Sequence, residues 1–175
     1  GYRCTSLEDI ARRCGMTKAN LFHHFKSKED LGLAVLEYKM RCYRCDCLQS
    51  QFADDPVEGV ARLFSDCAKH YRGNGCKAGC FFANIALEMA DTSESFRKRV
   101  DEFFGEWICA LECALRKARS AGDFPPSFAP GAAAEAVFAL YEGAILLART
   151  RRDPDVFTRM GKQARQLLEA QRLRR

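Results

Sequence analysis

The sequence is short of the features that mark membrane proteins, secreted proteins and disordered chains. No run of 18 uncharged apolar residues occurs in its 175 residues, and the most apolar stretch, 132–148, is interrupted by Glu135 and Glu142, so we expect no membrane span. We identify no cleavable signal. Proline occurs five times and tryptophan once, while 47% of the residues are hydrophobic. These values predict a globular chain that works in the cytoplasm.

Motifs of common enzyme classes are also absent. There is no Gly-rich phosphate loop, no HExxH, no GxSxG and no loop with paired carboxylates. Of the three histidines, His23 and His24 share one predicted helix. We therefore expect no enzyme activity, no catalytic residues and no cofactor.

Positive charge is concentrated at the two ends of the chain. Lys and Arg number 9 against 6 acidic residues in 1–47, 10 against 14 in 48–148, and 9 against 3 in 149–175. The N-terminal surplus suits a phosphate backbone, whose contacts dominate nucleic-acid affinity. For the C-terminal surplus we favour a helix end, where cations are stabilised, over a second DNA contact.

Residues 6–31 predict two short helices joined by a tight turn, with a third helix directly afterwards. Ser6 is expected to cap the first helix with Asp9 as its reciprocal carboxylate. Gly15 would end that helix in a left-handed turn. Thr17 and Ser27 would cap the next two helices.

The second helix is expected to have an inner and an outer face. The inner face would hold Leu21, Phe22 and Phe25, and the outer face would hold Lys18, Asn20 and His23. A short helix, a glycine turn and a second helix with a polar, cation-bearing face are what the major groove of DNA requires.

This stretch resembles the helix-turn-helix signature of the TetR/AcrR transcriptional repressors. The matching residues are Thr5-Ser6, Ile10-Ala11, Gly15, Thr17, Leu21-Phe22, His24-Phe25, Ser27-Lys28-Glu29 and Leu31. The resemblance implies an all-α chain, with a DNA-binding head and linker helix in 1–47 and a larger helical ligand-binding and dimerisation domain in 48–175. It also implies a family helix before Gly1 that closes the head. Phe22 stands where the family usually has Tyr, which removes a hydroxyl contact to phosphate.

We expect the head to bind double-stranded operator DNA. Lys18 can donate to guanine and Asn20 can pair with adenine, so both are predicted to contact bases. The predicted phosphate contacts are Thr5, Thr17, His23 and Lys28. Asn20 and Lys28 also fit plain solvated positions. His24 is expected to pack inside the head.

Helical periodicity extends through the remainder, and we find no strand or internal repeat. Helices are predicted from Pro56 to about 72, from about 79 to 90, from an Asp91–Glu94 capping box past Leu115, from 130 to 151, and from 154 to about 173. Residues 122–130 form the one clear loop.

The helix predicted at 130–151 is apolar over most of its circumference, because Glu135, Glu142 and Arg149 are spaced by seven and share one stripe. Such a helix needs cover on more than one side, most easily from a second subunit. The resemblance likewise implies a homodimer built on the last two helices. The candidate interface residues are Phe138, Tyr141, Ile145, Met160 and Leu167.

The resemblance implies that a small-molecule inducer, of an identity the sequence does not give, enters a pocket in the second domain and releases the operator. The candidate lining residues are Phe64, Cys67, Tyr71, Cys80, Phe81, Asn84, Glu88, Phe103, Trp107, Phe138 and Tyr141. Core packing is the alternative for each. The expected mechanism is a swing of the helix from Lys28 to about Leu48 that changes the separation of two recognition helices.

Ten cysteines are several times a normal share, and three interpretations stay open. The first is packing as a small apolar residue. The second is thiol sensing: Cys80 begins a predicted helix, whose dipole together with Lys77 would lower the thiol pKa, and Cys76 would be a resolving thiol. The third is metal binding by Cys67, His70, Cys76 and Cys80, by residues 42, 45 and 47, or by 109 and 113. None of these spacings is typical of a metal site, so we expect no metal. The rival function is a redox or metal-binding protein without operator binding.

Overall fold

A computed structural model describes residues 1–44, 51, 52, 54–77 and 79–173. These residues form eight helices and no strand: α1 (Leu7–Arg13), α2 (Lys18–His24), α3 (Lys28–Tyr43), α4 (Pro56–Gly73), α5 (Phe81–Met89), α6 (Glu94–Ser120), α7 (Pro130–Arg151) and α8 (Asp155–Glu169). The predicted all-α class is confirmed. The predicted domain boundary, the end of the linker helix near Leu48 and the cysteines at 45 and 47 lie outside the described residues.

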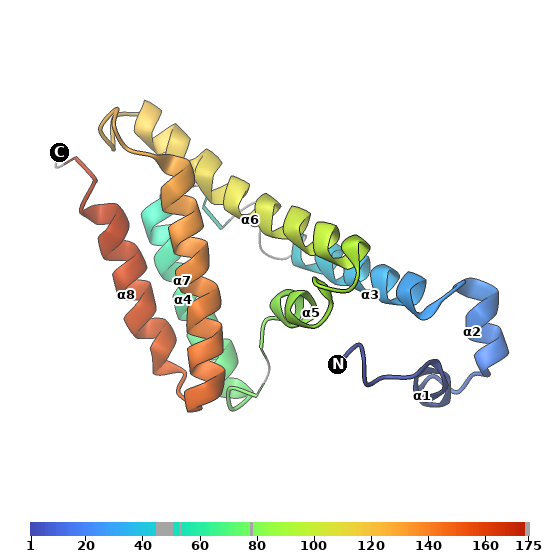
Figure 1. Ribbon diagram of the computed structural model, residues 1–175. Coiled ribbons are helices and arrows are strands. Elements are labelled where there is room, and N and C mark those ends of the chain that lie inside the picture. Colours follow the sequence, from blue (N-terminus) through green and yellow to red (C-terminus); the bar gives the residue numbers. More distant parts are fainter. Residues whose placement is uncertain (45–50, 53, 78, 174–175) are drawn as a thin grey trace.

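The molecule is elongated, with α1 and α2 at one end and a bundle of α4, α7 and α8 at the other (Figure 1). The long helix α6 connects the two ends: its 27 residues span about 40 Å at 1.5 Å per residue. We call residues 1–27 the head and the α4, α6, α7 and α8 assembly the bundle.

Capping residues begin the helices of the head as predicted. The Ser6 hydroxyl accepts the Asp9 N–H at 3.1 Å, and the Asp9 carboxylate accepts the Ser6 N–H at 3.2 Å. The Thr17 hydroxyl accepts the Asn20 N–H at the start of α2, and the Ser27 hydroxyl accepts the Asp30 N–H at the start of α3. Gly15 has φ = 66°, a left-handed conformation that ends α1 at low steric cost.

The predicted start of α6 and the predicted end of α8 are wrong. α6 is capped by Ser93, whose hydroxyl accepts the Phe96 N–H at 3.4 Å, and not by Asp91. Asp91 lies in a turn in which the N–H groups of Thr92 and Ser93 both donate to the Met89 carbonyl, so the chain is not yet helical there. α8 ends at Glu169, before the predicted end near 173.

The core of the bundle forms where α4 packs on α8, α8 on α7 and α7 on α6. Its largest fully buried side chains include Phe64, Phe157, Leu111 and Leu168. α7 is long and apolar enough to cross a membrane by length and composition alone. In this structure it lies between α6 and α8 and buries one face, as a core helix of a bundle does.

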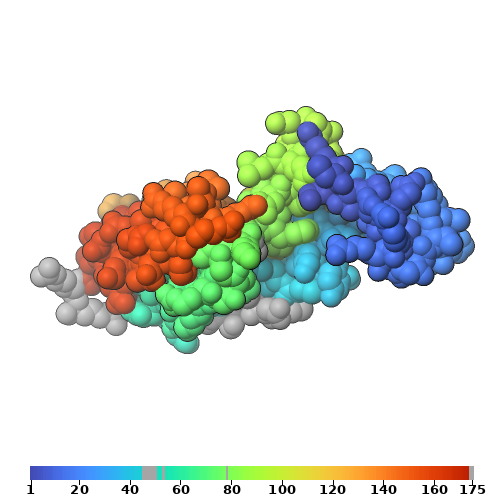
Figure 2. All heavy atoms as spheres, turned by 90° about the horizontal axis from the view of Figure 1, so that it is seen from below, coloured from blue at the N-terminus to red at the C-terminus, as the bar shows by residue number. Residues whose placement is uncertain are grey.

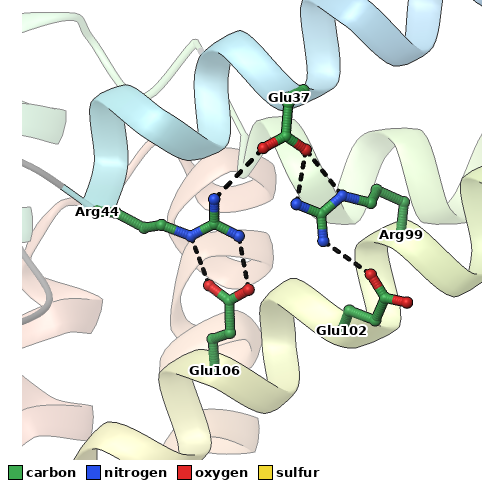
Figure 3. Close-up of polar contacts among 5 residues, drawn as sticks. All are labelled: Glu37, Arg44, Arg99, Glu102 and Glu106. Atoms are coloured by element: carbon green, nitrogen blue, oxygen red, sulfur yellow. Dashed lines mark hydrogen bonds and ion pairs between the residues drawn. The ribbon is translucent and has the colours of Figure 1, made fainter.

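α3 is fastened to α6 by an ion-pair network that we call the α3–α6 clamp (Figure 3). The Glu37 carboxylate accepts from Arg99 at 2.6 and 2.8 Å and pairs with Arg44 at 3.4 Å. Arg44 also makes two hydrogen bonds to Glu106, at 2.5 and 2.6 Å. Glu102 binds Arg99 from within α6. The clamp therefore joins the last part of α3 to the first half of α6.

The head is attached to the same region through its first residues, which lie against α5 and the start of α6 in Figure 2. The Glu88 carboxylate accepts the N–H groups of Tyr2 and Arg3 at 2.8 and 2.6 Å. The Tyr2 ring meets Phe96 edge-on at 5.0 Å. A Cβ on Gly32 would stand 2.7 Å from Tyr2 and 2.8 Å from Phe96, so only glycine allows this approach.

Candidate DNA-binding head and ligand cavity

The outer face of α2 presents the residues expected to contact DNA. Lys18, Asn20 and His23 are all exposed. The Lys18 ammonium pairs with the Glu8 carboxylate of α1, which holds the long side chain beside α1 when DNA is absent. The Thr17 hydroxyl accepts the Asn20 N–H at 3.2 Å and keeps its own proton for another acceptor.

Two expectations for α2 are wrong. Leu21 is buried, but Phe22 is 47% exposed and His24 is also exposed. Phe22 lies one helical turn after Lys18, so the two share a face, and the Lys18 ammonium stands 5.8 Å from the ring centroid. A residue next to Leu21 on a helix is turned by about 100°, which takes Phe22 away from α1.

Thr5 and Lys28 contact the first residues of the chain. The Thr5 hydroxyl donates to the Gly1 carbonyl at 2.7 Å. The Lys28 ammonium donates to the Arg3 carbonyl at 3.3 Å and lies 4.5 Å from the centroid of the Tyr2 ring. A phosphate contact by either side chain would compete with these bonds.

A cavity of about 820 Å³ opens between α3, α4, α5, α6 and α7. Eight of the eleven predicted lining residues border it: Cys67, Tyr71, Cys80, Phe81, Phe103, Trp107, Phe138 and Tyr141. Trp107 and Tyr141 stack at 5.7 Å with an interplanar angle of 18°, and Phe138 packs beside Trp107 at 5.1 Å. The sequence pattern therefore anticipated most of the aromatic wall.

The other three predicted lining residues lie elsewhere. Phe64 is buried in the bundle, with its ring edge-on to Tyr141. Asn84 accepts from Arg149 at 3.2 Å on the outer side of α5. Glu88 holds the head through Tyr2, as described above. α5 turns these two polar side chains away from the cavity while its first residues border it.

Several residues of the cavity wall were not among those predicted from the sequence. They are Lys39, Cys42, Tyr43, Gln51, Leu63, Asp66, His70, Phe82, Phe104, Glu142 and Ile145. The Tyr43 ring packs edge-on to Phe82 at 6.1 Å and to Phe103 at 5.6 Å, so the end of α3 is part of the wall. A signal for Glu142 existed, since a lone acid amid apolar neighbours is typical of a site, but the residue was placed on a polar stripe with Glu135 and Arg149.

Two protein-family models match this chain and identify the kind of protein that it is. Residues 1–35 match the model of bacterial regulatory proteins of the tetR family, and residues 56–163 match the C-terminal domain of LmrA/YxaF-like transcriptional regulators. The chain belongs to the TetR family. It is therefore a helix-turn-helix transcriptional regulator, and such regulators are typically repressors with a ligand-binding C-terminal domain.

Individual relatives agree with this assignment. The transcriptional regulator AcuR of Cereibacter sphaeroides is 29% identical over 158 residues, which cover 89% of this chain and 72% of that protein. The repressor DhaR of Mycobacterium sp. strain GP1 is 27% identical over 157 residues, covering 87% and 76%. A TetR-family regulator from Cytophaga hutchinsonii shares the fold, with a TM-score of 0.86 at 23% identity over 100% of this chain and 88% of that one. These relatives are transcriptional regulators.

The cysteines of this TetR-family chain correct one expectation. Burial, and next the Glu142 carboxylate, raise the pKa of Cys80 to about 12, so the predicted lowering by the helix dipole and Lys77 is wrong. The Cys80 sulfur accepts the Ala83 N–H at 3.4 Å, yet this bond does not outweigh burial. Cys76 is fully buried, which removes it as an accessible resolving thiol.

The metal interpretation fails within the described part of the chain. There, no group of three or more His, Cys, Asp or Glu side chains could hold a metal ion. Cys109 and Cys113 lie one turn apart on the exposed side of α6, with their sulfur atoms 3.9 Å apart. The cluster that includes residues 45 and 47 falls outside the described residues.

Two of the five predicted dimer residues are covered by their own chain. Tyr141 and Ile145 are buried and border the cavity, so they are not available to a second subunit. Phe138 also faces the cavity. Met160 and Leu167 are half-buried on α8, and Leu146 on α7 is 61% exposed. Any interface on these helices would have to use this outer surface.

Proposed function

We propose that this regulator is a cytoplasmic homodimeric repressor that binds operator DNA through the outer face of α2 and releases it when a small, mainly apolar molecule fills the 820 Å³ cavity. The observation that carries the proposal is that α3 reaches from the DNA-binding head to the cavity. This helix begins beside α2 at Lys28 and ends at Tyr43 on the cavity wall. A ligand that moves Tyr43 can therefore shift the helix that follows the DNA-binding elements.

We propose that Lys18 and Asn20 contact bases. The proposed phosphate contacts are Thr5, Thr17, His23 and Lys28. Exposure of the α2 residues supports the first group. For dimerisation we propose Leu146, Met160 and Leu167 on the outer surface of α7 and α8, in place of the buried residues. A two-fold dimer would present two α2 helices to successive major grooves.

The experiment starts with a random-sequence selection that identifies the operator, followed by fluorescence anisotropy with that duplex. We expect Asn20→Ala and Lys18→Ala to weaken operator binding by about 1–3 kcal/mol each and to relax specificity at one base pair. Lys162→Ala is the control, because this exposed lysine lies on α8 at the far end of the molecule. Equal losses in all three variants would contradict an α2 interface.

A thiol-responsive regulator is the second candidate function. It is favoured by Cys42, Cys67 and Cys80, which all border the same cavity, so an electrophile bound there would meet three thiols. The high pKa of Cys80 weighs against it, and the alkylation experiment in the Discussion distinguishes the two functions.

A further inference from the structure

One acidic side chain stands out on the cavity wall. Glu142 lies in the middle of α7, is half-buried, and takes part in no ion pair among the described residues. Burial raises its pKa, and the hydrogen bond with the Cys80 thiol opposes that effect. A carboxylate held in such a place without a cation is costly, so its neighbourhood favours the arrival of a positive charge.

None of the other charged groups that border the cavity in the described residues forms an ion pair with Glu142. Lys39, Asp66 and His70 are all exposed, which places them at the mouth of the cavity. Asp66 is already neutralised by Lys69, at 2.8 Å. In the part of the chain that is described, Glu142 is therefore the one charged group on the inner wall, and no arginine borders the cavity.

The aromatic wall of the cavity also favours a cation. Trp107 and Tyr141 stack on each other, Phe138 packs beside Trp107 at 5.1 Å, and Phe104 packs beside Phe138 at 5.0 Å. Trp107 and Tyr141 are buried, whereas Phe104 and Phe138 are half-buried on the cavity wall. The face of an aromatic ring carries negative potential and attracts cations, most strongly for Trp. An anion would meet these faces and the Glu142 carboxylate without any inner cationic partner.

We propose that the cavity selects a flat aromatic monocation, such as a protonated or quaternary aromatic amine, with Glu142 as its counter-ion and the half-buried rings of Phe104 and Phe138 as its aromatic contact surface. This inference rests on the proposed function, since it takes the cavity as the inducer site. The volume of about 820 Å³ accommodates a ligand of three fused rings and its substituents.

The test uses three fluorescent probes that share one ring system. At pH 7.5, 9-aminoacridine is a cation, acridine is neutral and acridine-9-carboxylate is an anion. Titration of the purified chain should show 9-aminoacridine binding at least about tenfold more tightly than acridine, with the carboxylate weakest. Glu142→Gln should remove the preference for the cation while acridine binding stays the same, which also shows that the cavity has kept its shape.

Asp66→Asn is the matched control, because it removes a carboxylate from the same cavity at an exposed, already paired position. It should leave the cation preference within about twofold of the original. Equal binding of the three probes to the unaltered chain would overturn the charge selectivity and leave the cavity as a ligand site. A preference that survives Glu142→Gln would overturn the role of Glu142. Failure of all three probes to bind would overturn the cation site altogether, whereas the proposed function is tested separately by the operator-binding experiment above.

Discussion

Cys80 caps α5, where the partial positive charge of a helix N-terminus ordinarily lowers a thiol pKa. In this protein, burial and the Glu142 carboxylate raise the Cys80 pKa instead. The side chain is half-buried against the cavity wall, and the Glu142 carboxylate of α7 adds a negative charge beside it, which together raise the pKa to about 12. At neutral pH nearly every Cys80 side chain therefore carries its proton and is a poor nucleophile.

We expect Cys80 to resist alkylation in the ligand-free protein. At pH 7.5 its thiolate fraction is on the order of a thousandfold below that of an ordinary thiol. Iodoacetamide labelling followed by peptide mass spectrometry should modify the exposed Cys4 and Cys14 well before Cys80. Glu142→Gln should speed up Cys80 labelling, because it removes the negative charge. Rapid labelling of Cys80 in the unaltered chain, with loss of operator binding, would instead support the thiol-responsive function.

At the scale of elements, the approach of α8 to α4 depends on Gly161. A Cβ at this position would stand 2.7 Å from the Cβ of Phe64, which is fully buried and cannot retreat. Gly105 on α6 offers the opposite case, since nothing lies within 4 Å of a Cβ built there. An alanine at position 161 therefore changes both packing and helix propensity, whereas an alanine at position 105 changes helix propensity alone.

Gly161→Ala should destabilise the chain by up to about 2 kcal/mol, because an overpacking cost of about 1–3 kcal/mol is offset only by a propensity gain of about 1 kcal/mol. In thermal unfolding this corresponds to a Tm lower by roughly 4 °C. Gly105→Ala should raise the Tm by roughly 2 °C, because only the propensity gain applies. A rise in Tm for both variants would show that α4 and α8 adjust without cost.

The elements also show which features the sequence could predict. Caps at Ser6, Thr17 and Ser27 were found because capping involves residues two or three apart. The exposure of Phe22 and the inward position of Glu142 were missed, because they depend on which distant helix covers each face. The start of α5 covers the middle of the α7 stripe, where Cys80 meets Glu142, and no local pattern encodes that contact.

The whole molecule joins a DNA-binding end to a ligand-binding end through few contacts. α3 crosses from one to the other, and the α3–α6 clamp holds it at Glu37 and Arg44. The bond from Glu88 to the backbone of Tyr2 holds the head at a second point. Two attachment points limit the positions that the head can adopt, so operator binding should depend on both.

Glu37→Gln is expected to loosen α3 without emptying the cavity. Glu37 is 40% exposed and Arg99 26%, so the stability loss should stay near 0.5–1 kcal/mol. Operator affinity should fall on the order of fivefold, corresponding to about 1 kcal/mol, because the head samples more positions. Binding of acridine in the cavity should not change. The comparison requires anisotropy with operator DNA and probe titration on the same preparation.

Glu102→Gln provides the control for this last variant, since Glu102 binds Arg99 within α6 and its removal leaves the ion pairs between α3 and α6 in place. The pH dependence gives a further check. Arg99, and then Arg44, lower the pKa of Glu37, so the clamp's contribution is complete above the usual range of a glutamate and is lost only as the pH falls through the lowered value. Operator binding by the unaltered chain and by Glu37→Gln should therefore differ by a constant factor between pH 6 and 8. Equal effects of Glu37→Gln and Glu102→Gln on operator binding would reduce the clamp to a solvated surface pair.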